Sequence, residues 1–153
     1  MDADIGQLME EIHSTGTFRK KAERIKECSK ALIQRHKGEV PNNMEDLADL
    51  PGIGRKTANM VLANSFGIPG IIMDTHVIRL SKRIGLTDKN YPDKMEADLM
   101  EVVPRKDWTD FSNLLMFQGR EICLARIPKC KICKISMFCD YYKVVSRKAK
   151  YAK

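Results

Sequence analysis

Four cysteines near the C-terminal end have the residue type and spacing of a metal site. Cys123, Cys130, Cys133 and Cys139 follow the pattern C-x6-C-x2-C-x5-C. The N-terminus lacks a secretory signal, so we expect a reducing cytosolic setting in which thiols bind metal rather than pair as disulfides. Spacing alone leaves a tetrahedral zinc ion and an iron–sulfur cluster both open. Cys28 is far from this quartet in a helical pattern, and we interpret it as a buried structural thiol.

The cysteine region also carries the positive charge of the chain. From Arg120 to Lys153, ten Lys and Arg stand against two Asp and Glu, a local charge of +8, whereas the whole chain carries +7. A localised basic face predicts a polyanionic partner. Solubilising charge is the alternative for any single residue. The basic side chains that we expect to contact phosphates are Arg126, Lys129 and Lys131, with Lys134 close behind.

A second candidate site is the glycine-rich segment 50–58, Leu-Pro-Gly-Ile-Gly-Arg-Lys-Thr-Ala. Two glycines between two helical patterns predict a tight hairpin whose backbone N–H groups face outward, because side chains there would block a phosphate. The following helix begins at the same place, so the positive end of its dipole faces the anion. An ordinary turn between helices is the alternative. We expect Leu50 and Ile53 to pack inward, and the phosphate-binding residues of the hairpin to be Pro51, Gly52, Ile53, Gly54 and Arg55.

The elements that position these residues are predicted to be helices, and no segment has a convincing strand pattern. The first has an expected buried face of Ala22, Ile25, Ser29, Leu32 and Ile33. Caps and breakers predict a helix to about His36, a short one at 44–49 after the cap Asn43, and others at about 55–66, 75–84, 92–102 and from near Trp108. The basic tail Ser146–Lys153 is expected to fray, and no apolar run approaches a membrane span. The sequence therefore predicts an all-α protein.

Three segments in this order carry a specific resemblance. The glycine-rich hairpin, the segment Met73-Asp74-Thr75-His76-Val77-Ile78-Arg79 and the cysteine quartet resemble the endonuclease III family of DNA glycosylases over about Asp4–Tyr142. The resemblance implies a helix-hairpin-helix DNA glycosylase fold. A partial helical barrel at 1–68 would contain the helix-hairpin-helix at about 44–66, and a helical iron–sulfur cluster domain with a basic tail would occupy 69–153.

The resemblance also implies a cofactor, a partner and a location. The four cysteines would hold a [4Fe-4S] cluster. The partner would be double-stranded DNA that contains damaged bases or abasic sites, bound by a monomer with no membrane association. The location would be cytoplasmic, at the nucleoid in a prokaryote.

By match to the family motif, Lys56 is the nucleophile and Asp74 supports it. A lysine in the first turn of a helix, beside Arg55, experiences a positive potential that favours the neutral, attacking amine. Asp74 is also placed to cap the helix that begins at Thr75, and the two roles are compatible. In the family pattern this Asp stabilises positive charge on the sugar as the base leaves. We interpret His76 as structural rather than catalytic.

The expected reaction is removal of an oxidised pyrimidine followed by cleavage at the abasic site. Lys56 would attack C1′ of a nucleotide that has left the base stack, and the resulting Schiff base would permit β-elimination of the 3′ phosphate. Related adenine- and thymine-mismatch glycosylases lack Lys at this position. Two other interpretations stay open: a non-catalytic DNA-binding module, and a redox protein that uses the cluster for electron transfer.

The chain departs from the family pattern in two places. Family members have further helices before the equivalent of Met1, one with a Gln that helps fill the gap left by the extruded base. We therefore expect part of the barrel and of the base pocket to be missing, whether through truncation, a partner that supplies the helices, or a self-contained short form. Gln118 stands where many relatives have His, and we expect this difference to affect packing only.

Overall fold

All regular secondary structure in the region that the structure describes is helical. The computed structural model describes the backbone of residues 3–151 and the side chains of residues 3–147, and this range contains no strand. The predicted all-α class is therefore confirmed. The chain forms two compact units, an N-terminal unit Met1–Gly67 and a C-terminal unit Ile68–Lys153, which are described separately below. Within the described range, none of the helices combines the length and apolarity needed to cross a membrane.

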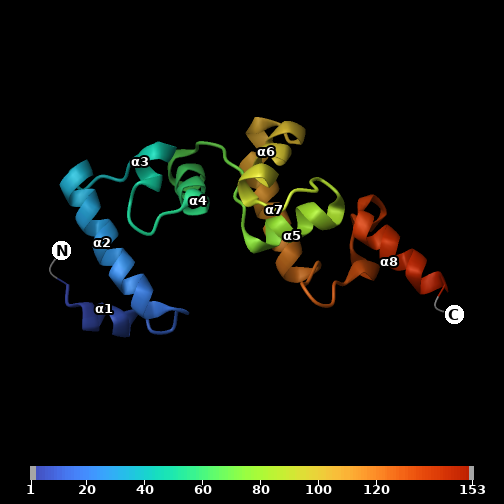
Figure 1. Ribbon diagram of the computed structural model, residues 1–153, viewed down its shortest axis with the longest axis horizontal. Coiled ribbons are helices and arrows are strands. Elements are labelled where there is room, and N and C mark those ends of the chain that lie inside the picture. The colour runs from blue at the N-terminus through green and yellow to red at the C-terminus, as the bar shows by residue number, and fades with distance from the viewer. Residues whose placement is uncertain (1–2, 152–153) are drawn as a thin grey trace. The chain divides into compact units, whose positions relative to one another are not determined.

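The described residues of the N-terminal unit, 3–67, form four helices in two packed pairs (Figure 1). Helix α1 packs against α2, and α3 against α4. Asn43 caps α3, since its side-chain oxygen accepts a hydrogen bond from the backbone N–H of Asp46. Gly67 ends α4 in the left-handed conformation that glycine tolerates best. The bounds are α1 Ile5–Glu11, α2 Phe18–His36, α3 Met44–Ala48 and α4 Arg55–Phe66. The predicted end of α2 is therefore confirmed, and the predicted limits of α3 and α4 are confirmed to within about one residue.

The buried face of α2 is narrower than predicted. Ala22 and Ala31 are buried, but Ile25 is 44% exposed and Ile33 is 48% exposed. The prediction that both isoleucines belong to the buried face is wrong for this unit, because periodicity marks an apolar stripe without saying how much of it a neighbour covers. Cys28 is half-buried, and burial raises the pKa of its thiol. It is less enclosed than the buried thiol that the sequence predicts.

The C-terminal unit is built around helices α5 and α7, which pack against each other (Figure 1). Its α-helices are α5 Thr75–Ile84, α6 Pro92–Val102, α7 Trp108–Glu121 and α8 Asp140–Tyr151. Three short 3₁₀ helices join them: η1 Arg105–Asp107, η2 Cys130–Ile132 and η3 Ser136–Phe138. The core side chains are Ile71, Met73, Val77, Leu80, Met95, Leu99 and Leu115. Most of this core comes from the apolar faces of α5 and α6, and the predicted limits of these two helices are confirmed.

Close contact between α5 and α7 depends on Gly119. A Cβ atom added at Gly119 would lie 2.8 Å from Cβ of His76 and 3.1 Å from a guanidinium nitrogen of Arg79. Arg79 uses this proximity to donate hydrogen bonds to the Gly119 carbonyl at 2.9 Å and to the Cys123 carbonyl at 2.9 and 3.2 Å. These carbonyls lie at the end of α7, where backbone C=O groups lack hydrogen-bond donors from the helix itself. Arg79 therefore fixes the start of the cysteine segment against α5.

Helix α8 extends into the segment Ser146–Lys153, for which the sequence predicts a fraying tail. The helix continues to Tyr151, so the prediction for Ser146–Lys153 is wrong as far as that residue, and residues 152 and 153 lie outside the described range. Two features anchor its first turn. The Arg83 guanidinium lies 4.7 Å from the centroid of the Tyr141 ring, and Asp140 complements the positive end of the helix dipole.

Candidate functional site

The glycine-rich segment forms the predicted hairpin between α3 and α4. Leu50 is buried and Ile53 is half-buried, so the inward packing is confirmed for Leu50 and partial for Ile53. The Ile53 N–H donates to the Leu50 carbonyl at 3.0 Å and closes the turn. Gly52 has φ +78°, a conformation that other residues rarely adopt, whereas Gly54 has an ordinary φ of −96°. The two glycines thus serve different purposes.

Gly54 is the N-cap of α4 and leaves this end of the helix open. It has no side chain with which to cap the helix, and a Cβ added there would meet nothing within 4 Å. The first-turn N–H groups of a helix, together with the positive end of its dipole, form an anion site when no side chain covers them. The hairpin therefore has the open surface that a phosphate requires.

Cationic side chains lie in the first turn of α4 and beside the hairpin. Arg55 and Lys56 are both exposed in the first turn of α4. Lys21 and Arg24 of α2 line a groove together with the hairpin, and a Cβ added to Gly52 would come within 3.0 Å of the Arg24 side chain. The predicted nucleophile thus lies on the surface next to the hairpin.

Asp74 caps α5, as the sequence predicts. One carboxylate oxygen, Oδ1, accepts hydrogen bonds from the backbone N–H of His76 at 2.8 Å and of Val77 at 2.7 Å. The orientation of this half-buried carboxylate is therefore fixed. His76 Nδ1 lies 3.2 Å from the Arg79 guanidinium, a contact that fits the structural role predicted for this histidine. Lys56 belongs to the N-terminal unit and Asp74 to the C-terminal unit.

The four cysteines of the quartet line one small cavity in the C-terminal unit. Apolar and aromatic residues complete its wall: Ile122, Pro128, Tyr141 and Tyr142, with Ser136 beside them. Within the described residues, no three His, Cys, Asp or Glu side chains converge closely enough to hold a single metal ion. The donor set is nonetheless suited to a thiolate-bound group, because four sulfurs surround one enclosed space.

Hydrogen bonds orient several of these sulfurs. Arg83 donates to Sγ of Cys123 at 3.3 Å, and Gln118 donates through Nε2 to Sγ of Cys133 at 3.3 Å. Arg83 also donates to the carbonyls of Leu124 and Ala125, both at 2.7 Å, and so holds the loop that follows the first cysteine. Donors aimed at ligand sulfurs are typical of the surroundings of a metal centre.

Charge on the other three cysteines acts on the Cys130 thiol. Burial raises the pKa of Cys130, charge on Cys123, Cys139 and Cys133 raises it further, and the Arg83 guanidinium acts in the opposite direction. Without a cation these influences favour the neutral thiol, whereas a cation bound by the four sulfurs would favour the thiolates.

Sequence reasoning missed the arginines that organise this region. Arg79 and Arg83 lie one turn apart on α5 and reach backbone atoms more than 40 positions away. Two arginines at positions i and i+4 lie on the same face of a helix, and on a helix that also carries core residues this spacing could have indicated their role from the sequence. The basic residues that the sequence did single out, Arg126, Lys129 and Lys131, are all exposed, and they line a separate groove together with Cys130.

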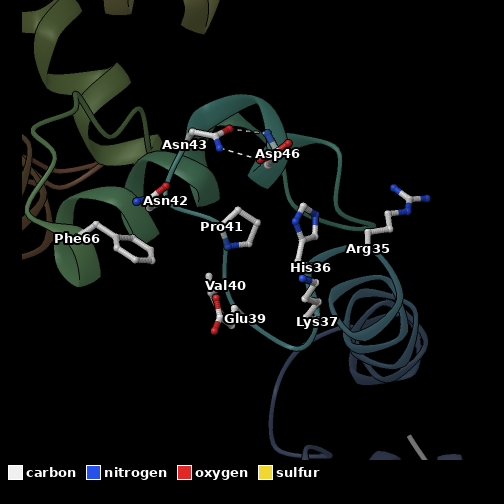
Figure 2. A pocket seen from close by; sticks show the side chains of 10 residues that line it. All are labelled: Arg35, His36, Lys37, Glu39, Val40, Pro41, Asn42, Asn43, Asp46 and Phe66. Atoms are coloured by element: carbon white, nitrogen blue, oxygen red, sulfur yellow. Dashed lines mark hydrogen bonds between the residues drawn. The ribbon is translucent and has the colours of Figure 1, made fainter.

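A separate hollow in the N-terminal unit contains no predicted site residue (Figure 2). Asn43 and Asp46 at its rim hydrogen-bond to each other, and Arg35 pairs with Asp49 at 2.6 Å. These polar groups already serve the fold, so the hairpin is the stronger candidate in this unit. The lining residues are Arg35, His36, Lys37, Glu39, Val40, Pro41, Asn42, Asn43, Asp46 and Phe66.

Known sequences with the same arrangement are DNA repair proteins. The family described as HhH-GPD superfamily base excision DNA repair protein matches residues 1–105. Endonuclease III of Synechocystis sp. is 47% identical over 137 residues, which cover 89% of this chain and 63% of that protein. Endonuclease III of Bacillus subtilis is 42% identical over 134 residues, 87% of this chain and 61% of that protein. The chain thus spans slightly under two thirds of the length of these curated relatives.

Solved structures agree with the sequence matches. A trapped endonuclease III–DNA covalent intermediate superimposes with a TM-score of 0.90 at 37% identity, over 95% of this chain and 68% of that one. A thermostable thymine-DNA glycosylase superimposes with a TM-score of 0.83 at 29% identity, over 93% of this chain and 67% of that one. The predicted helix-hairpin-helix glycosylase fold is confirmed. Because the family match covers well over half of the sequence, the chain belongs to the HhH-GPD superfamily of base excision DNA repair proteins.

Proposed function

We propose that this protein is a bifunctional DNA glycosylase and abasic-site lyase that removes oxidised pyrimidines. The observation that carries the proposal is the exposed Lys56 in the first turn of α4, next to a glycine hairpin whose N-cap leaves the helix end open. The similarity to proteins named endonuclease III, one of them solved as a covalent intermediate with DNA, supports it.

The chemistry proposed for Lys56 proceeds through a covalent adduct. The neutral amine attacks C1′ of the extruded nucleotide, the C1′–N bond to the base breaks, and the base leaves with that electron pair and takes up a proton. Ring opening gives a Schiff base between Nζ and C1′. Loss of a proton from C2′ then expels the 3′ phosphate by β-elimination, and water releases the sugar from the lysine. Asp74, fixed by its two backbone hydrogen bonds, stabilises the positive charge that develops on the sugar.

DNA binding is proposed to use backbone contacts that do not depend on base sequence. The hairpin residues Pro51 to Arg55 would hold one phosphate through backbone N–H groups and the α4 dipole. The exposed side chains of Arg126, Lys129 and Lys131 would contact further phosphates of the same duplex. The proposed partner is double-stranded DNA, bound by a cytoplasmic monomer.

The cysteine cavity is proposed to hold the [4Fe-4S] cluster that the family resemblance implies, within a helical cluster domain at residues 69–153. Four sulfurs around one enclosed space, with Arg83 and Gln118 donating to two of them, support this assignment. When bound, the cluster would close the loop and provide a centre able to exchange one electron. Anaerobic purification followed by iron, sulfide and zinc analysis tests it: iron and sulfide in equal amounts are expected, and zinc alone would contradict the assignment.

The test of the activity is excision from a duplex that contains one oxidised pyrimidine. Base release and strand cleavage are both expected from the wild-type protein, and neither from Lys56→Gln. Lys30→Gln, at an exposed lysine of α2, is the matched control and should behave as wild type. Duplex binding without base release or cleavage by wild-type protein would instead favour the non-catalytic DNA-binding module.

A further inference from the structure

We infer that Gln118 is a positioning residue whose hydrogen bond to the Cys133 sulfur raises the reduction potential of the bound cluster. The inference rests on the proposed function, because it needs the four cysteines to hold the [4Fe-4S] group. It goes beyond that proposal by assigning a role to a side chain that the sequence predicts to affect packing only.

Gln118 connects two of the cysteines through different atoms. Its backbone carbonyl accepts hydrogen bonds from the N–H of Cys123 at 2.7 Å and of Ile122 at 3.0 Å. Its side-chain Nε2 donates to Sγ of Cys133 at 3.3 Å. One half-buried residue in the last turn of α7 therefore holds the first cysteine by its backbone and reaches the third by its side chain.

The polarity of this contact determines its effect on the cluster. An amide N–H that points at a ligand sulfur stabilises negative charge on that sulfur. The reduced cluster carries one more negative charge than the oxidised cluster, and part of that charge resides on the sulfurs. The hydrogen bond therefore stabilises the reduced form more strongly and raises the potential.

Gln118 is a better probe of this effect than Arg83. Arg83 also donates to a ligand sulfur, at 3.3 Å, but the same guanidinium holds the carbonyls of Leu124 and Ala125. Its removal would disturb the loop as well as the sulfur. The Gln118 side chain can be replaced while its backbone carbonyl continues to hold Cys123.

Protein-film voltammetry on anaerobically purified protein with matched iron and sulfide content tests the inference. Gln118→Leu removes the donor at similar volume and should shift the midpoint potential to a more negative value. Gln118→Glu places a carboxylate beside the sulfur and should shift it further in the same direction. Gln118→His restores an N–H donor and should return the potential toward wild type. Gln34→Leu, on an exposed position of α2, should leave it unchanged.

The outcomes separate this inference from the proposal beneath it. Wild-type protein that binds no iron and sulfide would overturn both. If wild-type protein binds the cluster and both Gln118→Leu and Gln118→Glu have the wild-type midpoint potential, the inference alone is overturned. If Gln118→Leu does not assemble the cluster, the comparison of Gln118→Glu with Gln118→His decides, and equal potentials in those two variants would refute the role of the hydrogen bond.

Discussion

Substitution of Asp74 separates its capping role from its proposed catalytic role. The carboxylate accepts the N–H groups of His76 and Val77 through one oxygen, so it stabilises α5 whatever else it does. Asp74→Ala removes both acceptors, whereas Asp74→Asn keeps an acceptor oxygen and removes only the negative charge. The two variants should therefore differ in stability and agree in activity.

The structure sets the size of the stability effects. Loss of an N-cap side chain costs about 0.5–2 kcal/mol, and a half-buried cap with two short hydrogen bonds belongs in the upper part of that range. Loss of charge at a helix N-terminus costs about 0.3–1 kcal/mol. The free energy of unfolding should decrease from wild type to Asp74→Asn and further to Asp74→Ala.

Activity should not follow this order. If the carboxylate stabilises positive charge in the transition state, both variants lose it and single-turnover excision should fall on the order of 100-fold or more in each. Urea unfolding gives the stability, and base release from a duplex with one oxidised pyrimidine gives the activity. Asn43→Ala is the matched control, because it removes the analogous cap of α3 and should lower stability by a similar amount without affecting excision.

Two results would refute this reasoning. Asp74→Asn with wild-type excision would leave Asp74 as a cap and nothing more. Asp74→Ala with wild-type stability would mean that the two backbone hydrogen bonds contribute nothing to α5.

Two further predictions concern packing and a thiol. Gly119→Ala should lower the thermal stability. A Cβ 2.8 Å from His76 costs about 1–3 kcal/mol in overpacking, whereas the gain in helix propensity is only about 1 kcal/mol. The control Gly16→Ala should be neutral or stabilising, because a Cβ added there meets nothing within 4 Å. Burial raises the pKa of Cys28, so its alkylation, followed by mass spectrometry, should be slower at pH 8 than that of a cysteine peptide. Since the folded pKa exceeds the unfolded one, the contribution of Cys28 to stability is present below the unfolded pKa of about 8.5 and decreases as pH rises through the folded pKa. Equal alkylation rates for Cys28 and the cysteine peptide would contradict the burial of this thiol. A Gly119→Ala protein as stable as wild type would contradict the close contact between Gly119 and His76.

Local signals predicted the fold well because helix ends are set by neighbouring residues. Asn43, Gly67, Asp74 and Gly85 act within a few positions of the chain, and each marks a helix limit in the structure. Helix α8 was missed because its first turn is anchored by Arg83, far away in sequence. A single-sequence pattern does not reveal that partner.

The same distinction between local and long-range contacts applies to the candidate sites. The hairpin and the four cysteines are contiguous patterns, and residue type and spacing were enough to find them. The bonds from Arg79, Arg83 and Gln118 to the cysteine segment depend on how α5 and α7 pack. Likewise, the apolar period of α2 did not reveal that Ile25 would remain exposed. Patterns identified the candidate groups, and tertiary packing determines what orients them.

The most direct test of the proposed chemistry is borohydride trapping on a duplex that contains one abasic site. Reduction of the Schiff base would link the protein covalently to DNA through Nζ of Lys56. We predict an adduct with wild-type protein and none with Lys56→Gln, although both bind the duplex. An equal adduct with Lys56→Gln, or none with folded, DNA-binding wild-type protein, would contradict the assignment of Lys56 as the nucleophile.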